Sequence, residues 1–389
     1  MDNLDIELRK HKFIQLVQDH YNPLCVCRSL GKRGINPIVI LYGKNPCLLN
    51  HSKYPSKVHL VETLEEGYKL LVKQYGNEEY KPFVFCSDDT TESYLDEHYD
   101  ELKDHFIFYN AGEQGRVTFL QNKKTITSLG VEAGMTIPKS EVVDTGVLPK
   151  TLKYPIITKV LASTMGAWKG DVYICHNEEE LKEAYKKIKS PKLILQEYIY
   201  KKGEFCMEGF SCNDGKDVFI PYICNYIRIY DNSYGHYMEF TPFKDETLKE
   251  KILELFRLTK FNGIFEIEFM KGPNDENYFL EINFRASTWN YALTVGGGNL
   301  PYFWAKSMLS GKIHYEEMEL TDKPFRAMVE PDDFINKVLK AREVSLKQWV
   351  SEVKKCECTY FYDKDDSKPI KAYIYHRILN GIKKKLRLV

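Results

Sequence analysis

Two short stretches of the sequence alternate apolar residues with carboxylates or amides. One runs from Phe265 to Phe269 and the other from Phe279 to Phe284, with a Gly-Pro-Asn sequence starting at Gly272 between them. Alternation of this kind predicts strands with one buried face. Glycine, proline and asparagine are typical of the loop of a β-hairpin. The sequence therefore predicts a hairpin that carries acidic side chains on one face.

Pairing the apolar residues fixes which acidic residues face one another. With Ile267 opposite Ile282, Glu268 falls opposite Glu281, and Glu266 falls opposite Asn283. Like charges placed opposite each other destabilise an ordinary sheet, whereas clustered oxygen donors are what Mg²⁺ prefers. The hairpin is thus a candidate metal site, and the alternative is a solvated acidic face at a sheet edge.

The composition is that of a globular protein with two or three domains. The chain has 389 residues, of which 43% are hydrophobic and 28% charged. Its 55 basic and 55 acidic residues cancel, so the net charge gives no indication of nucleic-acid binding.

The ten cysteines do not form the C-x-x-C pairs of a zinc site. No apolar amino-terminal segment resembles a signal peptide, and no run of apolar residues is long enough to span a membrane. We therefore expect a cytoplasmic protein with reduced thiols and no transmembrane segment.

Strand-like and helix-like stretches alternate over the first hundred residues. This order predicts a parallel sheet covered by helices. No G-x-G-x-x-G sequence follows the first strand, so the dinucleotide-binding fingerprint is absent. The expected strands are Phe13 to Val17, Asn36 to Tyr42 and Phe83 to Cys86, and the expected helices are Asn22 to Lys32, Leu64 to Gln74 and Tyr94 to Lys103.

Ser87, Asp88, Asp89 and Thr90 follow the third of these strands. Loops at the carboxyl ends of parallel strands are where such folds bind ligands, so these residues could meet a substrate, and Asp88 is the candidate contact. The alternative is that Ser87 or an aspartate caps the following helix.

A second series of elements follows from Gln121. Within it, the strand Tyr154 to Val160 carries Lys159, and a loop of small residues from Ala162 to Gly170 could offer backbone N–H groups to phosphates. The other expected elements are a helix from Gln121 to Gly134, a strand from Asp171 to Cys175, a helix from Glu178 to Lys189, strands at Leu193 to Ile199, Phe205 to Ser211 and Val218 to Tyr226, and a helix from Thr247 to Thr259.

The order of these motifs resembles the ATP-grasp superfamily, in the carboxylate–amine ligase branch that contains carbamoyl-phosphate-synthase-like ligases and D-aspartate ligase. The resemblance runs from about residue 10 to about 312. It implies a fold of mixed α/β and α+β class, with an N-terminal doubly wound domain, a small lid subdomain and an ATP-grasp core. The expected boundaries are 1–120 for the first domain, 121–200 for the lid, 201–312 for the core, and 313–389 for a C-terminal extension of unclear role.

The resemblance also implies which residues hold ATP. Two lysines reach the nucleotide phosphates, and the matching positions are Lys123 and Lys159. A lysine on a buried strand is costly unless it meets an anion, which favours this role for Lys159. Lys124 is the alternative to Lys123. The hinge strand would contact adenine through Glu197 and Ile199, and Glu204 would bind the ribose hydroxyls.

By the same resemblance, Glu268, Glu281 and Asn283 are ligands for Mg²⁺, with two ions expected and Mn²⁺ compatible with the same ligands. Glu266 would lie next to these ligands without binding the metal itself. Arg285 would be the catalytic cation that holds phosphate oxygens during transfer. The chain has Phe284 where the family commonly has proline.

Three further residues are candidate substrate contacts. Ser287 and Asn290 follow the hairpin in a region where related enzymes bind the acceptor. Arg228 would clamp a phosphate or a carboxylate, and its alternative is an ordinary surface arginine.

The implied activity is an ATP-dependent carboxylate–amine ligase that releases ADP and forms an amide or peptide bond through an acyl phosphate. Amino-acid-type substrates, as in D-aspartate ligase, are favoured. The alternatives are a catalytically silent ATP-binding sensor or scaffold, and a carbamoyl-phosphate-type ligase. The partners would be a small carboxylate and a small amine, without nucleic acid, and a homo-oligomer is compatible with this activity. The basic C-terminal segment, His376 to Val389, would form a solvated helix or, as the weaker alternative, contact a membrane surface.

Overall fold

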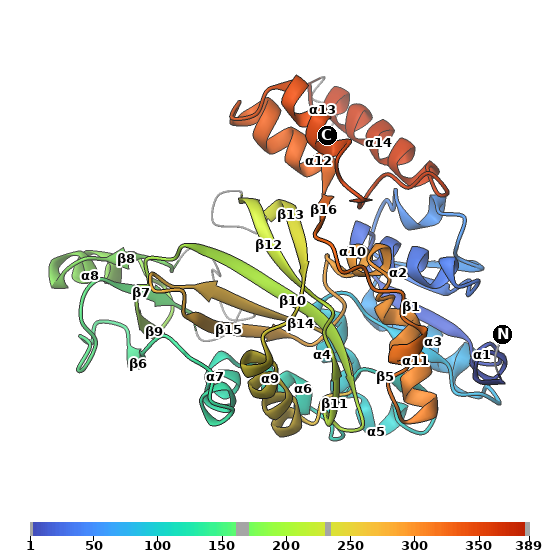
Figure 1. Ribbon diagram of the computed structural model, residues 1–389, viewed down its shortest axis with the longest axis horizontal. Helices are drawn as coiled ribbons and strands as arrows, with labels where there is room; N and C mark the ends of the chain where they lie inside the picture. The colour runs from blue at the N-terminus through green and yellow to red at the C-terminus, as the bar shows by residue number, and fades with distance from the viewer. Residues whose placement is uncertain (1–2, 161–170, 230–234, 386–389) are drawn as a thin grey trace.

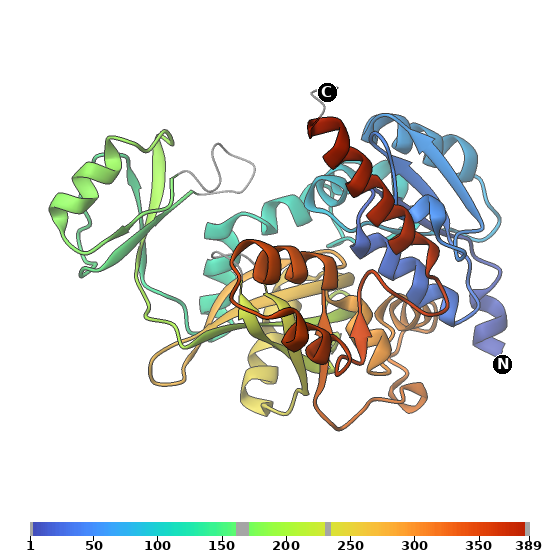
Figure 2. The ribbon, with the colours of Figure 1, turned by 90° about the horizontal axis from the view of Figure 1, so that it is seen from above.

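The computed structural model describes residues 3–160, 171–229 and 235–385. Within these ranges the strands form three sheets, one in each of three successive parts of the chain (Figure 1). The small second part projects from the other two, which lie against each other (Figure 2).

The N-terminal part contains the predicted parallel sheet. The confirmed strand β1 is buried along its whole length, as expected when helices cover both faces of a sheet. Two strands, β3 and β5, were not predicted. The strands are β1 (Phe13–Val17), β2 (Ile38–Tyr42), β3 (Lys57–Val61), β4 (Phe83–Phe85) and β5 (Ile107–Phe108); the helices are α1 (Asn3–Leu8), α2 (Tyr21–Lys32), the 3₁₀ turn η1 (Leu49–His51), α3 (Leu64–Tyr75), α4 (Asp89–Glu97) and α5 (Tyr99–Leu102).

This sheet reverses its direction of growth between β1 and β4. The strand order is β3-β2-β1-β4-β5, so the chain builds outward from β1 on one side and then continues on the other. The loops that follow β1 and β4 therefore open onto one crevice, which is where doubly wound folds bind ligands.

The second part is a lid with a small core of its own. Its four-stranded sheet has the order β6-β9-β7-β8, and α8 packs on it through Leu181 and Ala184. The helix α7 forms the approach to this lid. The elements are α6 (Arg116–Leu120), α7 (Lys123–Glu132), β6 (Ser140–Asp144), β7 (Ile156–Lys159), β8 (Ile174–Cys175), α8 (Glu178–Tyr185) and β9 (Lys192–Glu197).

The third part is built on a large sheet with the order β15-β14-β10-β12-β13-β16-β17, to which β11 adds beside β10. The hairpin β14–β15 lies at the edge of the sheet. The strands are β10 (Gly203–Cys212), β11 (Asp217–Phe219), β12 (Tyr222–Ile229), β13 (Gly235–Pro242), β14 (Gly263–Lys271), β15 (Asn277–Asn283), β16 (Phe325–Met328) and β17 (Cys358–Thr359); the helices are α9 (Glu246–Thr259), α10 (Asn290–Val295) and α11 (Leu300–Ser310).

The C-terminal residues extend this sheet and then return to the first part. Strand β16 pairs with β13, and β17 pairs with β16. The remaining helical segments are η2 (Tyr315–Glu317), α12 (Glu330–Asp333), a π-helical stretch η3 (Phe334–Lys340), α13 (Leu346–Val353) and α14 (Lys368–Lys385). The domain boundaries stay predictions, but residues after 313 clearly share the core sheet.

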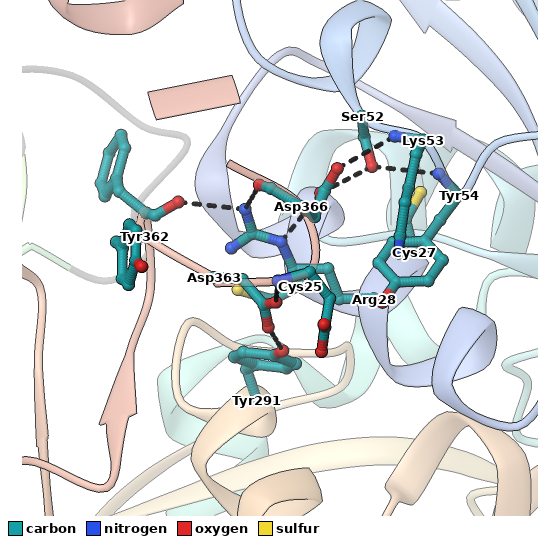
Figure 3. A network of polar contacts seen from close by, with 12 residues as sticks. Cys25, Cys27, Arg28, Ser52, Lys53, Tyr54, Tyr291, Tyr362, Asp363 and Asp366 are labelled. Atoms are coloured by element: carbon teal, nitrogen blue, oxygen red, sulfur yellow. Dashed lines mark hydrogen bonds and ion pairs between the residues drawn. The ribbon is translucent and has the colours of Figure 1, made fainter. Parts of the chain in front are cut away.

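A buried polar network fastens this C-terminal segment to the N-terminal part (Figure 3). Arg28 of α2 is fully buried, and its Nε donates to Asp366 Oδ2 at 3.0 Å. Its other nitrogens donate to the carbonyl oxygens of Tyr360 and Phe361 at 2.8 and 3.0 Å. The network thus ties α2 to the loop that follows β17.

None of the described helices is both long and apolar enough to cross a membrane. The cysteines are free thiols, as expected.

Candidate active site

The acidic hairpin has the predicted register. Ile267 pairs with Ile282, Glu268 with Glu281, and Glu266 with Asn283. The Asn283 amide group donates to Glu266 Oε2 at 2.9 Å and to Glu268 Oε1 at 3.1 Å. Asn283 therefore joins Glu266 and Glu268 directly, and Glu281 lies opposite Glu268 in the register.

Burial and mutual repulsion both act on these carboxylates. Burial raises the pKa of Glu268 well above its usual range, and the charges of Glu281 and Glu266 raise it further. Burial also raises the pKa of Glu266, against the opposing influence of Arg285 and the Asn283 hydrogen bond. A divalent cation would offset this repulsion, and carboxylate and amide oxygens are the donors that Mg²⁺ prefers. The residues present therefore fit a magnesium site.

Arg285 lies directly beside this cluster. Its Nε donates to Asp89 Oδ1 at 2.7 Å, and Asp89 belongs to the first turn of α4 in the N-terminal part. Burial opposes the charged form of Arg285, but Asp89 outweighs this effect, so the pKa is raised and the guanidinium stays charged. The sequence did not indicate this contact, because it joins residues 196 positions apart.

The two predicted lysines line one cavity between the lid and the core. This first cavity has a volume of about 340 Å³ and is bounded by α7, the lid sheet and β15, with Lys123 and Lys159 among its lining residues. Lys123 Nζ lies 3.1 Å from Glu281 Oε2. Lys124 lines the same cavity, but Lys123 also reaches the metal cluster, which favours Lys123 as the phosphate ligand.

Lys159 is held in place by a neutral partner. Its Nζ donates to Gln196 Oε1 at 2.7 Å across the β7–β9 pair. Burial, followed by the charge of Lys123, lowers the pKa of Lys159 to about 8, although Glu281 and Glu204 act in the opposite direction. Gln196 was not predicted as a site residue. A buried lysine that lacks a carboxylate partner is suited to bind an anion.

A second cavity, of about 380 Å³, lies on the other side of the metal cluster. It shares Lys123, Glu268 and Glu281 with the first cavity and is also lined by Asn283 and Arg285. The two lysines, the oxygen cluster and Arg285 thus line two adjoining cavities, and the shared residues lie between them.

The residues predicted to hold adenine and ribose lie along the connection from β9 to β10. Glu197 ends β9, and its Oε1 accepts from the Lys139 N–H at 2.8 Å. Ile199 is half-buried in the connecting segment, and Glu204, the second residue of β10, makes an ion pair with Lys201 at 2.6 Å. Their nucleotide contacts stay predictions. The predicted small-residue loop, 162–170, lies outside the described residues.

The four candidate substrate residues occupy different surroundings. Ser287 lines the second cavity. Asn290 is fully buried and donates to Asn22 Oδ1 at 3.1 Å, so it joins the core to the N-terminal part. Asp88 caps α4 by accepting from the Thr91 N–H at 2.9 Å, and it also lines a third cavity.

Arg228 is engaged away from these cavities. Its Nε and one terminal nitrogen bind the carboxylate of Asp333 at 3.0 and 2.8 Å, and Glu352 lies 2.8 Å from the same terminal nitrogen. Both partners belong to the C-terminal helices. Its guanidinium therefore has a structural partner set that the sequence did not indicate, and we do not include it in the proposed site.

Glu208 is a buried glutamate beneath the cluster that was not predicted as a site residue. Glu208 pairs in register with Glu266, and its Oε1 accepts from the Ser287 N–H at 2.7 Å. Burial and the charge of Glu266 raise the pKa of Glu208 well above its usual range. The signal was present in the sequence, because Glu208 interrupts an otherwise apolar strand.

Known proteins share this architecture. No family model matches the chain. The structure superimposes on N5-carboxyaminoimidazole synthetase from Staphylococcus aureus with a TM-score of 0.63, covering 85% of this chain and 86% of that one at 16% identity. Biotin carboxylase from Campylobacter jejuni matches with a TM-score of 0.63, covering 81% and 74% at 16% identity. The chain has the ATP-grasp fold.

Two further relatives agree with this ATP-grasp fold. The L-amino acid ligase from Bacillus licheniformis gives a TM-score of 0.60, covering 81% of this chain and 78% of that one at 15% identity. The N5-carboxyaminoimidazole ribonucleotide synthase of Staphylococcus aureus strain COL is 26% identical over 171 residues, or 42% of this chain. This match spans 43% of the relative's length, which is less than half of that protein.

Proposed function

We propose that this protein is an ATP-dependent carboxylate–amine ligase that releases ADP. The observation that carries the proposal is that two adjoining cavities share Lys123, Glu268 and Glu281 in their walls. A nucleotide in the first cavity would place its phosphates between the lysines and the oxygen cluster. A carboxylate substrate in the second cavity would then meet the terminal phosphoryl group beside Arg285.

Glu268, Glu281 and Asn283 would hold Mg²⁺, which neutralises phosphate charge and orients the phosphoryl group when it is bound. Lys123 and Lys159 bind phosphate oxygens from the α7 side and the lid side. Arg285, fixed by Asp89, holds the charge that develops during transfer. No protein nucleophile is needed, because these residues act by position and electrostatics.

The reaction has two steps. A carboxylate oxygen of the substrate attacks the γ-phosphorus, the bond to the β-phosphate oxygen breaks, and ADP leaves with that electron pair. The amine nitrogen then attacks the acyl carbon of the acyl phosphate, an amide bond forms, and inorganic phosphate leaves. An amine that binds as an ammonium cation loses one proton before its nitrogen attacks and a second as the amide forms, and both protons pass to solvent or phosphate.

Amino-acid-type substrates are the class we favour. The resemblance to D-aspartate ligase and the fold shared with an L-amino acid ligase both support this choice. A carbamoyl-phosphate-type ligase is less favoured, because the chain has one ATP-grasp unit and the resemblance includes no glutaminase. A silent ATP-binding scaffold would not need the ligand cluster.

The test is ADP release from ATP and Mg²⁺ over a panel of amino acids and small peptides, offered as pairs of acid and amine. Glu281→Gln should lower acid-dependent ADP release by roughly 100-fold. Glu276→Gln is the matched control, since Glu276 is a half-buried glutamate in the loop of the same hairpin and lines neither cavity. A panel in which no pair stimulates ADP release, or equal activity of the two variants, would refute the ligase.

A further inference from the structure

A third cavity lies where the N-terminal sheet reverses its growth. It has a volume of about 360 Å³ and is lined by the loops that follow β1 and β4. His20, Asp89, Arg285 and Thr288 line both this cavity and the second one. The third cavity therefore adjoins the place where the carboxylate would be activated.

The charges around the third cavity are mostly negative. Asp19, Asp88 and Asp89 line it, and Arg285 is the one lysine or arginine among its described lining residues. Asp19 accepts from the backbone N–H groups of residues 48 and 49, both at 3.0 Å, and Asp88 is the helix cap. Neutral donors hold these carboxylates in place without cancelling their charge, so the cavity attracts cations.

Asp89 is the carboxylate placed to meet a ligand. Its side chain is 46% exposed although Arg285 binds Oδ1. It lines both the second and the third cavity, so one group bound to it would stand next to the reacting carboxylate. Arg285 offsets part of the charge of Asp89, and Asp19 and Asp88 add to the field from the same side.

His20 supplies a fixed neutral donor in the same wall. Its Nδ1 accepts from the Asn22 N–H at 3.2 Å, so the proton of the neutral ring lies on Nε2. Its surroundings lower the pKa to about 4, chiefly by desolvation, with Arg285 adding to the effect against Asp19. A neutral N–H suits a carbonyl or hydroxyl oxygen and contributes no charge for binding a phosphate.

We propose that the third cavity selects the amine substrate by charge: it admits an amine that enters as an ammonium cation, carries no phosphate, and bears a carbonyl or hydroxyl oxygen near its nitrogen. This proposal rests on the proposed ligase activity, because it concerns the amine substrate of that reaction. The preference of the cavity for one amine over another can nevertheless be measured without turnover. The ammonium group binds beside Asp89, and the neighbouring oxygen accepts from His20. A phosphorylated amine of the same size is excluded by Asp19, Asp88 and Asp89.

The experiment uses ethanolamine and phosphoethanolamine, which differ only in the phosphate. Their binding to the full-length protein with ADP and Mg²⁺ is followed by saturation-transfer NMR, and each is also tested for stimulation of ADP release with an amino acid as the carboxylate. We expect ethanolamine to bind at least roughly tenfold more tightly than phosphoethanolamine.

The decisive variant adds a positive charge to the cavity wall. Thr90→Lys alters an exposed lining residue at the second position of α4. Thr247→Lys is its matched control, because Thr247 is an exposed threonine at the second position of α9. Thr90→Lys should weaken ethanolamine binding and improve phosphoethanolamine binding, each by roughly tenfold, while Thr247→Lys should change neither.

Each outcome has a distinct meaning. Selective ethanolamine binding that Thr90→Lys reverses supports the proposal, even if no amine stimulates ADP release, in which case only the ligase fails. Equal or tighter binding of phosphoethanolamine by the unmodified protein overturns it. Binding that is absent, or that responds equally to the two lysine variants, also overturns it.

Discussion

Lys159 lies in surroundings that disfavour its positive charge. It projects into the first cavity from the lid, and burial together with Lys123 lowers its pKa to about 8. The neutral Gln196 at 2.7 Å is its hydrogen-bond partner. In this position a lysine gains most from an incoming phosphate, because the phosphate restores the stabilisation of its charge.

The affinity for ATP should therefore depend on pH above about 8. Below the pKa of about 8, Lys159 carries its proton before ATP binds. Above it, binding must take up one proton, so the dissociation constant should rise by up to roughly tenfold per pH unit. Calorimetric titration with a non-hydrolysable ATP analogue between pH 7 and pH 9.5 measures this slope.

Two substitutions separate this effect from a general loss of the site. Lys159→Arg keeps a permanent charge, so it should retain much of the affinity and lose the pH dependence. Lys159→Met should bind weakly at every pH. An unchanged slope in both variants would assign the titration to another group.

Glu266 should affect the affinity for Mg²⁺, although it was predicted only to lie next to the metal ligands. Its Oε2 accepts from the Asn283 amide group at 2.9 Å and so orients the amide oxygen. Groups that orient metal ligands typically contribute 10- to 100-fold to metal affinity. Glu266→Gln should raise the Mg²⁺ concentration needed for ATP binding by roughly tenfold, and Glu268→Gln by more. A Mg²⁺ titration of thermal stability at fixed ATP measures both, and equal responses would contradict the division of roles.

The predicted metal ligands have partners nearby in the chain, whereas the contacts that could not be predicted from the sequence join distant residues. Glu268, Glu281 and Asn283 could be placed because a hairpin is local and its apolar alternation fixes the register. The pairing of Asp89 with Arg285, and the place of His20 beside them, arise only in the folded protein, because these residues start helices of the N-terminal part far from the core in sequence. The rule that led to Asp88, that loops after parallel strands bind ligands, applies equally to the loop containing His20.

At the scale of elements, helices and strands with strong hydrophobic patterns were predicted with nearly correct boundaries, whereas some of the short strands were not predicted. The strand Phe13–Val17 was predicted with its observed ends, and the helix expected from Thr247 begins one residue earlier. The helix expected from Tyr94 begins instead at Asp89, because Asp88 caps it. Strands β16 and β17 have only four and two residues and form by pairing with distant partners, so no local pattern marks them.

The segment after β17 should stabilise the whole protein through Arg28. Its guanidinium and the Asp366 carboxylate are essentially buried, with exposures of 0% and 1%. Removing one partner leaves the other charge buried without compensation, which typically costs about 3–5 kcal/mol. Arg28→Met should lower the free energy of unfolding by about that amount in urea denaturation.

Lys32 provides the matched control on the same helix. It pairs with Asp363 at 3.4 Å but is 36% exposed, so Lys32→Met should cost under about 1 kcal/mol. Similar losses for the two variants would show that burial does not set the strength of the connection between α2 and the C-terminal segment.

At the scale of the molecule, different pairs of the three parts enclose different cavities. The lid and the core enclose the first cavity, whereas the core and the N-terminal part enclose the second and third. The lid has a separate small hydrophobic core, and the other two parts share one large core. This division predicts that the lid can move as a unit while the substrate cavities keep their shape.

ATP should therefore protect the lid selectively from hydrogen exchange. Lys159 on β7 and Lys123 on α7 both face the first cavity, so a bound nucleotide would link the lid to the core through its phosphates. Slower exchange is expected in β6, β7 and β9 with ATP analogue and Mg²⁺, and little change in β1 and β2, which already belong to the large core. Lys159→Met should abolish the protection of the lid strands even at nucleotide concentrations that saturate the variant. Protection spread evenly over all three sheets would instead mean that the lid and the rest of the protein open together, and the separate core of the lid would then have no role in nucleotide binding.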